Sequence, residues 1–345
     1  MGEYARSLAI AQGARARWPG AAIRFMVSRA APYAAQTPFP TILLESSPTF
    51  HTAKVNDVIA EWRPDVVIFD NAGRTAQLRA ARRSGAKVVY ISARARQRRK
   101  AFRLRWMSLI DEHWIAYPEF IAGSLGLVER FKLKLMRRPM VRYLDVILDS
   151  ATSSGASMLA RTGCVAGEYA LVVPGGGTGH PGARDAAAQF LTAARGIAVG
   201  IDTVFVGPTD TASTAGGRSA ASRLRLVGAL PQSDLAQLMR GARLIVANGG
   251  STLLQSIACG KPCVAVPIAD DQNARIKRCV DVGVAVAAAL DSTAILQAAT
   301  ALLGNAGDLE ALAGRSVALG LRDGVDIALR ALSALTKLSA STNRQ

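Results

Sequence analysis

The sequence lacks long hydrophobic runs, paired cysteines and clustered histidines. No run of about eighteen apolar residues occurs, so nothing in the sequence predicts a transmembrane helix. The chain does not begin with a charged-then-apolar leader, and we therefore expect a cytoplasmic protein. Its four cysteines form no C-x-x-C pair and are typical of small buried hydrophobes in a reducing compartment. The histidines, His51, His113 and His180, lie far apart in sequence, and we expect no metal site.

Charge is abundant but uneven along the chain. The net charge is +17, and residues 1–150 hold 25 Lys/Arg against 12 Asp/Glu, a net +13. Much of this excess lies between Arg94 and Arg105. Such a field attracts polyanions, which include nucleic acid, an anionic membrane surface and a phosphorylated acceptor, although a solvated basic face is an equal alternative. Nucleic acid is the least supported partner because no aromatic-interleaved strand or known binding motif accompanies the charge.

The N-terminal half alternates predicted strands with predicted helices, which indicates a parallel sheet covered by helices. The predicted strands are Ile23–Ser28, Thr41–Leu44, Asp65–Asp70, Lys87–Ser92 and Glu112–Ala116. A helix from Met1 to Gln12 has no strand before it. We expect either a true start further upstream, which we favour, or a domain that lacks its first strand. The segment Phe131–Arg138 presents a membrane-facing or acceptor-facing surface, or is an ordinary exposed helix.

The C-terminal half contains a second α/β pattern. The whole chain has only 6% aromatic residues and abundant glycine, a composition that suits an α/β enzyme. Predicted strands run over Tyr169–Val173, Thr203–Val206, Leu224–Val227, Arg243–Ala247 and Cys263–Ile268. We expect an N-terminal domain in residues 1–150, a linker in 151–168, a C-terminal domain in 169–325, and a C-terminal helix and tail in 326–345.

A glycine turn between a buried strand and a helix is the first candidate binding site. Asn248-Gly-Gly-Ser-Thr252 places backbone N–H groups and the positive end of a helix dipole where they can bind an anion, usually phosphate. In the alternative interpretation, the Asn, Ser and Thr side chains only cap the helix.

A second glycine-rich loop follows the strand at Tyr169–Val173. Gly175-Gly-Gly-Thr-Gly-His180 can cradle a phosphate, and His180 either contacts a ligand or is only a polar loop residue. No Gly-Lys-Ser/Thr follows, so the loop is not a P-loop. Two such helix N-termini in one parallel-sheet domain predict a single ligand between them.

The combination of these segments resembles the donor-binding domain of GT-B glycosyltransferases. It is most similar to the bacterial peptidoglycan lipid N-acetylglucosaminyltransferase and to the UDP-sugar hydrolase of pseudaminic acid synthesis. The matching segments are the Gly175–His180 loop, Gly228-Ala-Leu-Pro-Gln-Ser-Asp-Leu235, Asn248–Pro262 and Val266–Ala274, in the family's order. The resemblance implies a fold of two Rossmann-like domains facing a cleft, with the acceptor on the N-terminal side and the donor on the C-terminal side.

The resemblance also implies roles for individual residues. Leu230 matches the position that reads uracil through its backbone, and Gln255 stands where the family usually has a Glu that binds the ribose hydroxyls. Asp271 and Gln272, with Asn273 beside them, match the residues that contact the donor sugar. The resemblance implies that backbone around Gly177–Gly179 and Gly249–Thr252 holds the diphosphate. The donor-binding residues of the two loops are Gly176, Gly177, Thr178, Gly179, His180, Asn248, Gly249, Gly250, Ser251 and Thr252.

Two carboxylates are candidates for the catalytic base. Glu3 lies in Gly2-Glu-Tyr-Ala-Arg6, which is similar to a Gly-x-Gly-His-x-x-Arg loop in the hydrolase relatives, and it replaces the histidine of that loop. Asp70 lies at the C-terminal end of a predicted strand, where parallel sheets bind ligands. Each is alternatively only a cap with no part in catalysis.

We therefore expect a glycosyltransferase that moves a sugar from a nucleotide-diphosphate donor, a UDP-sugar, to an acceptor hydroxyl. The resemblance implies a reaction that inverts the anomeric configuration. The sequence has no Asp-x-Asp metal-ligand pair, and helix N-termini can stabilise the departing diphosphate, so we expect a metal-independent reaction. No cofactor is expected. The acceptor is expected to be anionic or lipid-phosphate-linked, at the inner membrane face. Alternatives are a UDP-sugar hydrolase, a UDP-sugar 2-epimerase and a non-catalytic nucleotide-sugar-binding subunit.

Overall fold

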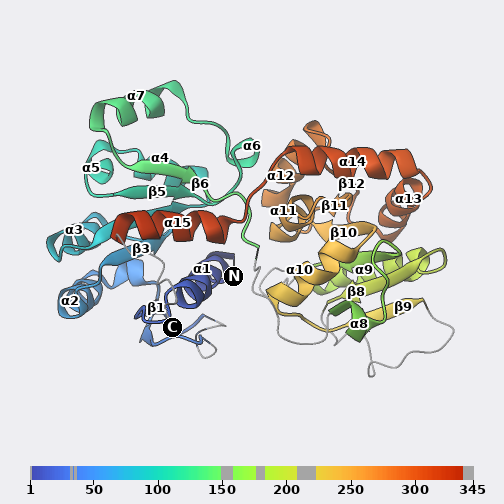
Figure 1. Cartoon of the computed structure of the whole chain (residues 1–345), viewed down its shortest axis with the longest axis horizontal. Helices are drawn as coiled ribbons and strands as arrows, with labels where there is room; N and C mark the ends of the chain where they lie inside the picture. The colour runs from blue at the N-terminus through green and yellow to red at the C-terminus, as the bar shows by residue number, and fades with distance from the viewer. Residues whose placement is uncertain are drawn as a thin grey trace, which may run out of the picture. The chain divides into compact units, whose positions relative to one another are not determined.

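The computed structural model describes residues 2–31, 34, 37–148, 158–175, 183–207 and 223–336. Contacts divide the chain into two compact units (Figure 1). Unit 1 contains Met1–Ile147 together with the C-terminal residues from Arg322, and unit 2 contains Leu148–Leu321. Within the described part of the chain, no helix is long and apolar enough to cross a membrane.

Unit 1 contains two parallel sheets in place of the single sheet expected from the alternating pattern. One sheet pairs β1 with β2, and the other has the order β3-β4-β5-β6. The strands are β1 (Phe25–Ser28), β2 (Thr41–Leu44), β3 (Val66–Asp70), β4 (Lys87–Ser92), β5 (Glu112–Ile115) and β6 (Met140–Tyr143). The five strands predicted in this half are confirmed to within two residues at each end, and β6 was not predicted.

The break between these two sheets has a simple topological meaning. In the doubly wound order 3-2-1-4-5-6, the first strand lies between the second and the fourth. Here β1 and β3 take the places of the second and fourth strands, so the break lies where the expected first strand would pair. Ile68 on β3 is exposed, whereas β4 is buried from Val88 to Ser92, as a covered parallel strand normally is.

The helices of unit 1 include one from each end of its sequence. They are α1 (Gly2–Arg17), α2 (Thr52–Trp62), α3 (Thr75–Arg83), α4 (Ala95–Ala101), α5 (Leu104–Met107), α6 (Glu119–Ala122), α7 (Leu127–Met136) and α15 (Gly324–Thr336), with a 3-10 turn, η2 (Pro48–Phe50). Figure 1 shows α15 in red beside α1 in dark blue, and the two helices contact each other. Ile10 of α1 and Trp18, which directly follows this helix, share a core with Val325 and Leu329 of α15 and with Trp114 of β5. The sequence had not indicated which domain the C-terminal helix joins.

Unit 2 is built on one six-stranded parallel sheet with the order β12-β11-β10-β7-β8-β9. The strands are β7 (Tyr169–Val173), β8 (Asp202–Val206), β9 (Leu224–Val227), β10 (Leu244–Asn248), β11 (Cys263–Val266) and β12 (Val286–Ala287). The central strands β7, β10 and β11 are buried along their whole length, which explains their nearly continuous apolar sequences.

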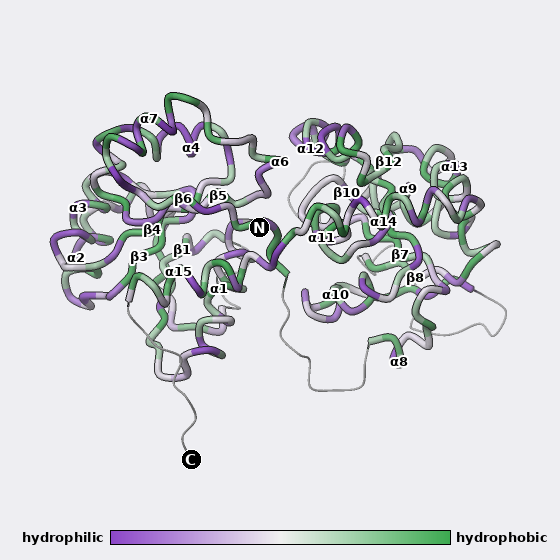
Figure 2. Tube along the Cα trace, turned by 45° about the horizontal axis from the view of Figure 1, so that its top comes forward, coloured by the Kyte–Doolittle hydropathy of each residue, from purple (hydrophilic) through white to green (hydrophobic). Residues whose placement is uncertain are grey.

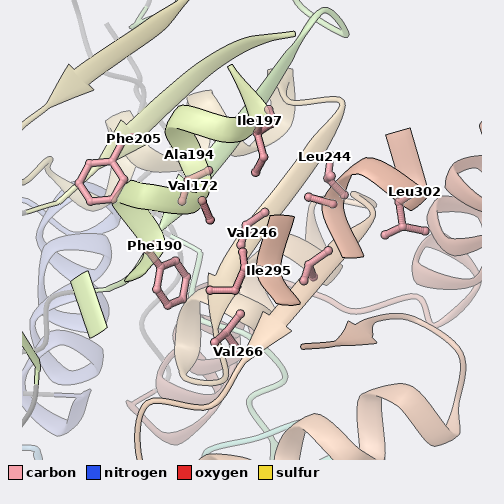
Figure 3. Close-up of a cluster of buried hydrophobic side chains, with 14 of the residues drawn as sticks. Val172, Phe190, Ala194, Ile197, Phe205, Leu244, Val246, Val266, Ile295 and Leu302 are labelled. Atoms are coloured by element: carbon pink, nitrogen blue, oxygen red, sulfur yellow. The ribbon is translucent and has the colours of Figure 1, made fainter. Parts of the chain in front are cut away.

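Helices cover this sheet, and one face of it packs against α9 and α13. Figure 3 shows Val172, Val246 and Val266 of the sheet beside Phe190 and Ile295 of these two helices. The helices of unit 2 are α8 (Met158–Thr162), α9 (Ala183–Ile197), α10 (Gln232–Gly241), α11 (Ser251–Ala258), α12 (Asp270–Asp281), α13 (Ser292–Leu303) and α14 (Ala306–Ala318). The two glycine loops therefore begin at the buried centre of the sheet.

Candidate functional site

The two glycine-rich loops follow neighbouring strands at the centre of the unit 2 sheet. The chain runs outward from β7 to β8 and β9, and then returns to the other side of β7 with β10, β11 and β12. The direction of winding therefore changes between β7 and β10. Open α/β sheets bind ligands at the carboxyl ends of their strands at such a switch point. The loop beginning Pro174-Gly175 and the turn Asn248–Gly250 both start there.

Asn248 joins the two loops. Its side-chain Nδ2 donates to the carbonyl of Pro174 at 2.7 Å, and its Oδ1 accepts from the N–H of Gly250 at 2.8 Å. Gly175 has a φ of +87°, and a Cβ atom added there would lie 1.7 Å from Nδ2 of Asn248. Only glycine therefore permits this contact. The buried Asn248 side chain fixes the start of each loop relative to the other.

The turn at Gly249 and Gly250 leads directly into the N-terminus of α11. A Cβ at Gly249 would lie 2.6 Å from Ile276 Cδ1 and 2.9 Å from Gln272 Cβ, so α12 packs against the backbone of the turn. Gly250 is the N-cap residue, and no side chain caps α11. Asn248 Oδ1 instead accepts from the N–H of Gly250 within the turn. An uncapped first turn leaves backbone N–H groups available to an anion.

The predicted donor-sugar residues on α12 do not share one environment. Gln272 is buried, and its Oε1 accepts from the N–H of Ile268 at 3.0 Å, which fixes the loop after β11. Asp271 and Asn273 are exposed. Gln255, one turn into α11, is buried, and Leu230 is half-buried just before α10.

Arg275 is a candidate site residue that the sequence analysis missed. Its guanidinium donates to the carbonyl of Gly249 at 2.5 Å and lies 3.9 Å from Asp271, four residues earlier on α12. This geometry places a positive charge beside the turn at the switch point. The spacing of Asp271 and Arg275 on the helix that follows the second glycine turn was the available signal. The predicted residues Gly176, Gly177, Thr178, Gly179 and His180 lie outside the described part of the chain.

The two candidate bases lie together in unit 1, at the carboxyl end of β3. Asp70 accepts from Arg6 through Nη2 at 2.5 Å and Nε at 3.1 Å, and from Ser7 Oγ at 3.0 Å. Burial raises the pKa of Asp70, and the Arg6 charge and these hydrogen bonds oppose that rise. With both oxygens engaged by neighbours, Asp70 is better suited to hold α1 against β3 than to accept a substrate proton.

Glu3 has a different environment from Asp70. Its exposed carboxylate accepts from Asn71 Nδ2 at 2.8 Å. Asn71 has a φ of +51°, and its Oδ1 accepts from the N–H of Ala93 at 2.7 Å, so it links Glu3 to the loop after β4. The result is a carboxylate that is positioned from one side and open on the other, as a general base requires.

A metal site was not found among the residues described. No group of three or more His, Cys, Asp or Glu side chains in that part of the chain is arranged to hold a metal ion.

Comparison with solved structures shows that nearly the whole chain matches known folds. MurG of Acinetobacter baumannii is 16% identical, with 96% of each chain covered and a TM-score of 0.62. The spinosyn rhamnosyltransferase SpnG with thymidine diphosphate is 15% identical, with 97% of each chain covered and a TM-score of 0.62. A Listeria monocytogenes protein assigned as a UDP-N-acetylglucosamine 2-epimerase is 14% identical, with 99% of this chain and 96% of that chain covered and a TM-score of 0.58.

The sequence itself matches no protein-family profile and no curated protein. At identities this low, the structural matches show the fold and do not show the activity. The chain has the two-domain α/β architecture of the GT-B fold, as its resemblance to that superfamily predicted.

Proposed function

We propose that this chain is a glycosyltransferase that moves a hexosyl or N-acetylhexosaminyl group from a UDP-sugar to an acceptor hydroxyl. The observation that carries the proposal is the Asn248 link, which holds two glycine loops together at the switch point of unit 2. An uncapped helix N-terminus and a guanidinium lie at the same turn. Together they favour an anionic ligand with a diphosphate's charge.

In the proposed mechanism, the acceptor hydroxyl attacks the anomeric carbon of the donor sugar as the bond to the diphosphate breaks. Direct displacement of this kind inverts the anomeric configuration. The N–H groups at the start of α11 and the Arg275 charge stabilise the departing UDP, so the proposed reaction proceeds without a metal or another cofactor. Glu3 takes the proton from the acceptor hydroxyl, and Asp70 holds the helix that carries Glu3.

The proposed acceptor is anionic, in the form of a lipid-phosphate-linked precursor of a cell-envelope polysaccharide at the inner face of the membrane. The net charge of +13 in residues 1–150 supports an anionic acceptor. SpnG, which has this fold, was determined with thymidine diphosphate, and this supports a nucleotide-diphosphate donor.

A second candidate is a UDP-sugar 2-epimerase, which the fold match to the Listeria monocytogenes protein over 99% of this chain favours. The two functions differ in their products. An epimerase keeps the nucleotide on the sugar and changes only one stereocentre, whereas a transferase releases UDP in proportion to glycosylated acceptor.

The experiment that tests the proposal incubates the protein with UDP-glucose and UDP-N-acetylglucosamine, with and without a polyprenyl-phosphate acceptor, and analyses the products by NMR and mass spectrometry. We expect UDP release that depends on acceptor and persists in the presence of EDTA. UDP release without acceptor indicates a hydrolase, and a new UDP-sugar epimer indicates an epimerase. Either product pattern contradicts the transferase proposal.

A further inference from the structure

Helix α7 turns its apolar side away from the protein. Leu127, Val128, Phe131 and Leu135 are 84, 66, 67 and 64% exposed, and no residue of α7 is buried. Their spacing places all four on one face of the helix. Surface helices normally direct such a face into the core. Figure 2 shows hydrophobic and hydrophilic residues alternating along α7, at the edge of unit 1.

Polar contacts on the opposite side fix this orientation. Glu129 faces inward and pairs with Arg98 through two contacts, of 2.6 Å and 3.1 Å. Arg98 also binds the carbonyls of Gly123 and Ser124, in the segment that leads into α7. Lys132 donates to the carbonyl of Phe102 at 3.2 Å. Because these contacts hold the polar side inward, the exposed apolar face is a fixed feature of the fold.

The apolar face has positive charge around it. Leu104 of α5, which contacts α7, is also exposed. Residues 94–138 contain 12 Lys/Arg and 4 Asp/Glu. Of these carboxylates, Asp111, Glu112 and Glu129 are already paired with arginines. Eight exposed cations of this stretch have no carboxylate partner in the described residues. They are Arg94 and Arg96 and the six from Arg99 onward, namely Arg99, Arg103, Arg105, Arg130, Lys134 and Arg137.

We propose that this surface, the α7 face (Leu104, Leu127, Val128, Phe131 and Leu135 with the six cations from Arg99 onward), docks on an anionic lipid bilayer. The apolar side chains enter the boundary between headgroups and acyl chains, and the Lys and Arg side chains bind lipid phosphates. Neither set suffices alone, because stable attachment requires both apolar burial and electrostatic attraction. The proposal does not depend on glycosyl transfer, so it is tested without turnover.

The same residues argue against other occupants of the α7 face. A second copy of the chain docked through this face would bring two sets of unpaired cations together, which like-charge repulsion opposes. Nucleic acid would satisfy the cations and leave the four apolar side chains of α7 in water. A bilayer of anionic lipid satisfies both.

The test is flotation of the full-length protein with vesicles of phosphatidylcholine alone or mixed with about one third phosphatidylglycerol. We expect binding only to the anionic vesicles, with F131S/L135S weakening it at least tenfold and R130Q/K134Q weakening it several-fold. The matched control V199S/V317S removes two equally exposed apolar side chains from unit 2 and leaves binding unchanged. A Phe131→Trp probe shifts its fluorescence to shorter wavelength when anionic vesicles are added.

Three results overturn the proposal. They are no binding to anionic vesicles, equal binding to phosphatidylcholine alone, and binding that F131S/L135S leaves intact. Light scattering provides a further check, since a wild-type dimer that F131S/L135S converts to a monomer shows that a second copy covers this face. Circular dichroism of each variant confirms that these exposed substitutions leave the fold intact.

Discussion

At the scale of single residues, Asn248 links the two glycine loops of unit 2. One side-chain amide satisfies the carbonyl of Pro174 and the N–H of Gly250, two backbone groups that belong to different loops. Because the side chain is buried, water cannot easily replace it at either position. The arrangement of the glycine loops therefore depends on this residue.

Replacing Asn248 by alanine tests that dependence. We expect Asn248→Ala to lower the free energy of unfolding by about 1–3 kcal/mol, because two buried backbone groups lose their partners. Nucleotide binding is expected to fall with it. Urea denaturation measures the first effect. Asn305→Ala, which removes an exposed cap of α14, is the control and should cost about 1 kcal/mol without changing nucleotide binding. Equal nucleotide binding by Asn248→Ala and wild type would argue against the loop link.

Substitutions of the two candidate bases, Asp70 and Glu3, are predicted to have different effects. Asp70→Asn leaves the buried Arg6 guanidinium without its counter-charge and should cost about 3–5 kcal/mol of unfolding free energy. Glu3→Gln should change that free energy by less than about 0.5 kcal/mol, because Glu3 is exposed. Its effect is expected on turnover, with a loss of about a hundredfold or more. Full activity in Glu3→Gln would exclude Glu3 as the base.

The buried His113 side chain is expected to make the free energy of unfolding depend on pH. The ring is buried, its Nε2 bonds Ser92 Oγ at 2.8 Å, and burial lowers its pKa from 6.5 to about 3. Between these values the unfolded chain binds a proton that the folded chain does not, so stability falls as the pH falls through this window. From about pH 7 to about pH 5 the loss from this group is about 2 kcal/mol. Urea denaturation at both pH values should show a smaller loss in His113→Gln, and an equal loss would contradict this account.

At the scale of elements, the two ends of unit 1's sequence meet in the α1–α15 pair. Gly13 packs tightly against α15, because a Cβ there would lie 2.6 Å from Val325 Cγ1 and 3.2 Å from Leu329 Cδ1. The core that these helices share with β5 places α15 in unit 1. The C-terminal helix is therefore part of the N-terminal unit's core.

Alanine substitution of two helical glycines tests this packing. A helix-interior Gly→Ala change normally stabilises by about 0.5–1 kcal/mol. Gly314→Ala on α14 has open space around its Cβ and should show that gain. Gly13→Ala should instead destabilise unit 1 by about 1–3 kcal/mol through overpacking against α15. Hydrogen exchange followed by mass spectrometry should locate the loss in unit 1, and a stabilising Gly13→Ala would contradict the packing described.

The sequence predicted strands better than it predicted how strands and helices associate. Buried strands such as Tyr169–Val173 were found at their observed bounds because covered parallel strands are continuously apolar. The break between β1 and β3 was anticipated only as a strand lacking before α1. The place of α15 could not be predicted, because an amphipathic helix fits any apolar surface of suitable shape, and its partner α1 lies about three hundred residues away.

At the scale of the whole molecule, the parts of the candidate site that depend on neighbouring residues were predicted from the sequence. The contacts between residues far apart in the sequence were not. The glycine turn Asn248–Thr252 was recognisable because its signal is local. The Asn248–Pro174 bond and the Arg6–Asp70 pair span 74 and 64 residues, and no local pattern reveals them. Proteins of 14–16% identity match this fold over nearly the whole chain.

We propose that the start of α11 binds the diphosphate of a uridine nucleotide, and calorimetric titration with UDP and UDP-N-acetylglucosamine is the most direct test of this binding. Ser251→Glu adds an exposed negative charge to the first turn of α11, which suits the helix dipole and so preserves the fold, but repels a bound anion. Thr293→Glu makes the same change in the first turn of α13, away from the switch point. We predict binding by wild type and Thr293→Glu, and affinity at least about tenfold weaker in Ser251→Glu. No binding of either nucleotide by wild type, or equal binding by all three proteins, would contradict the account.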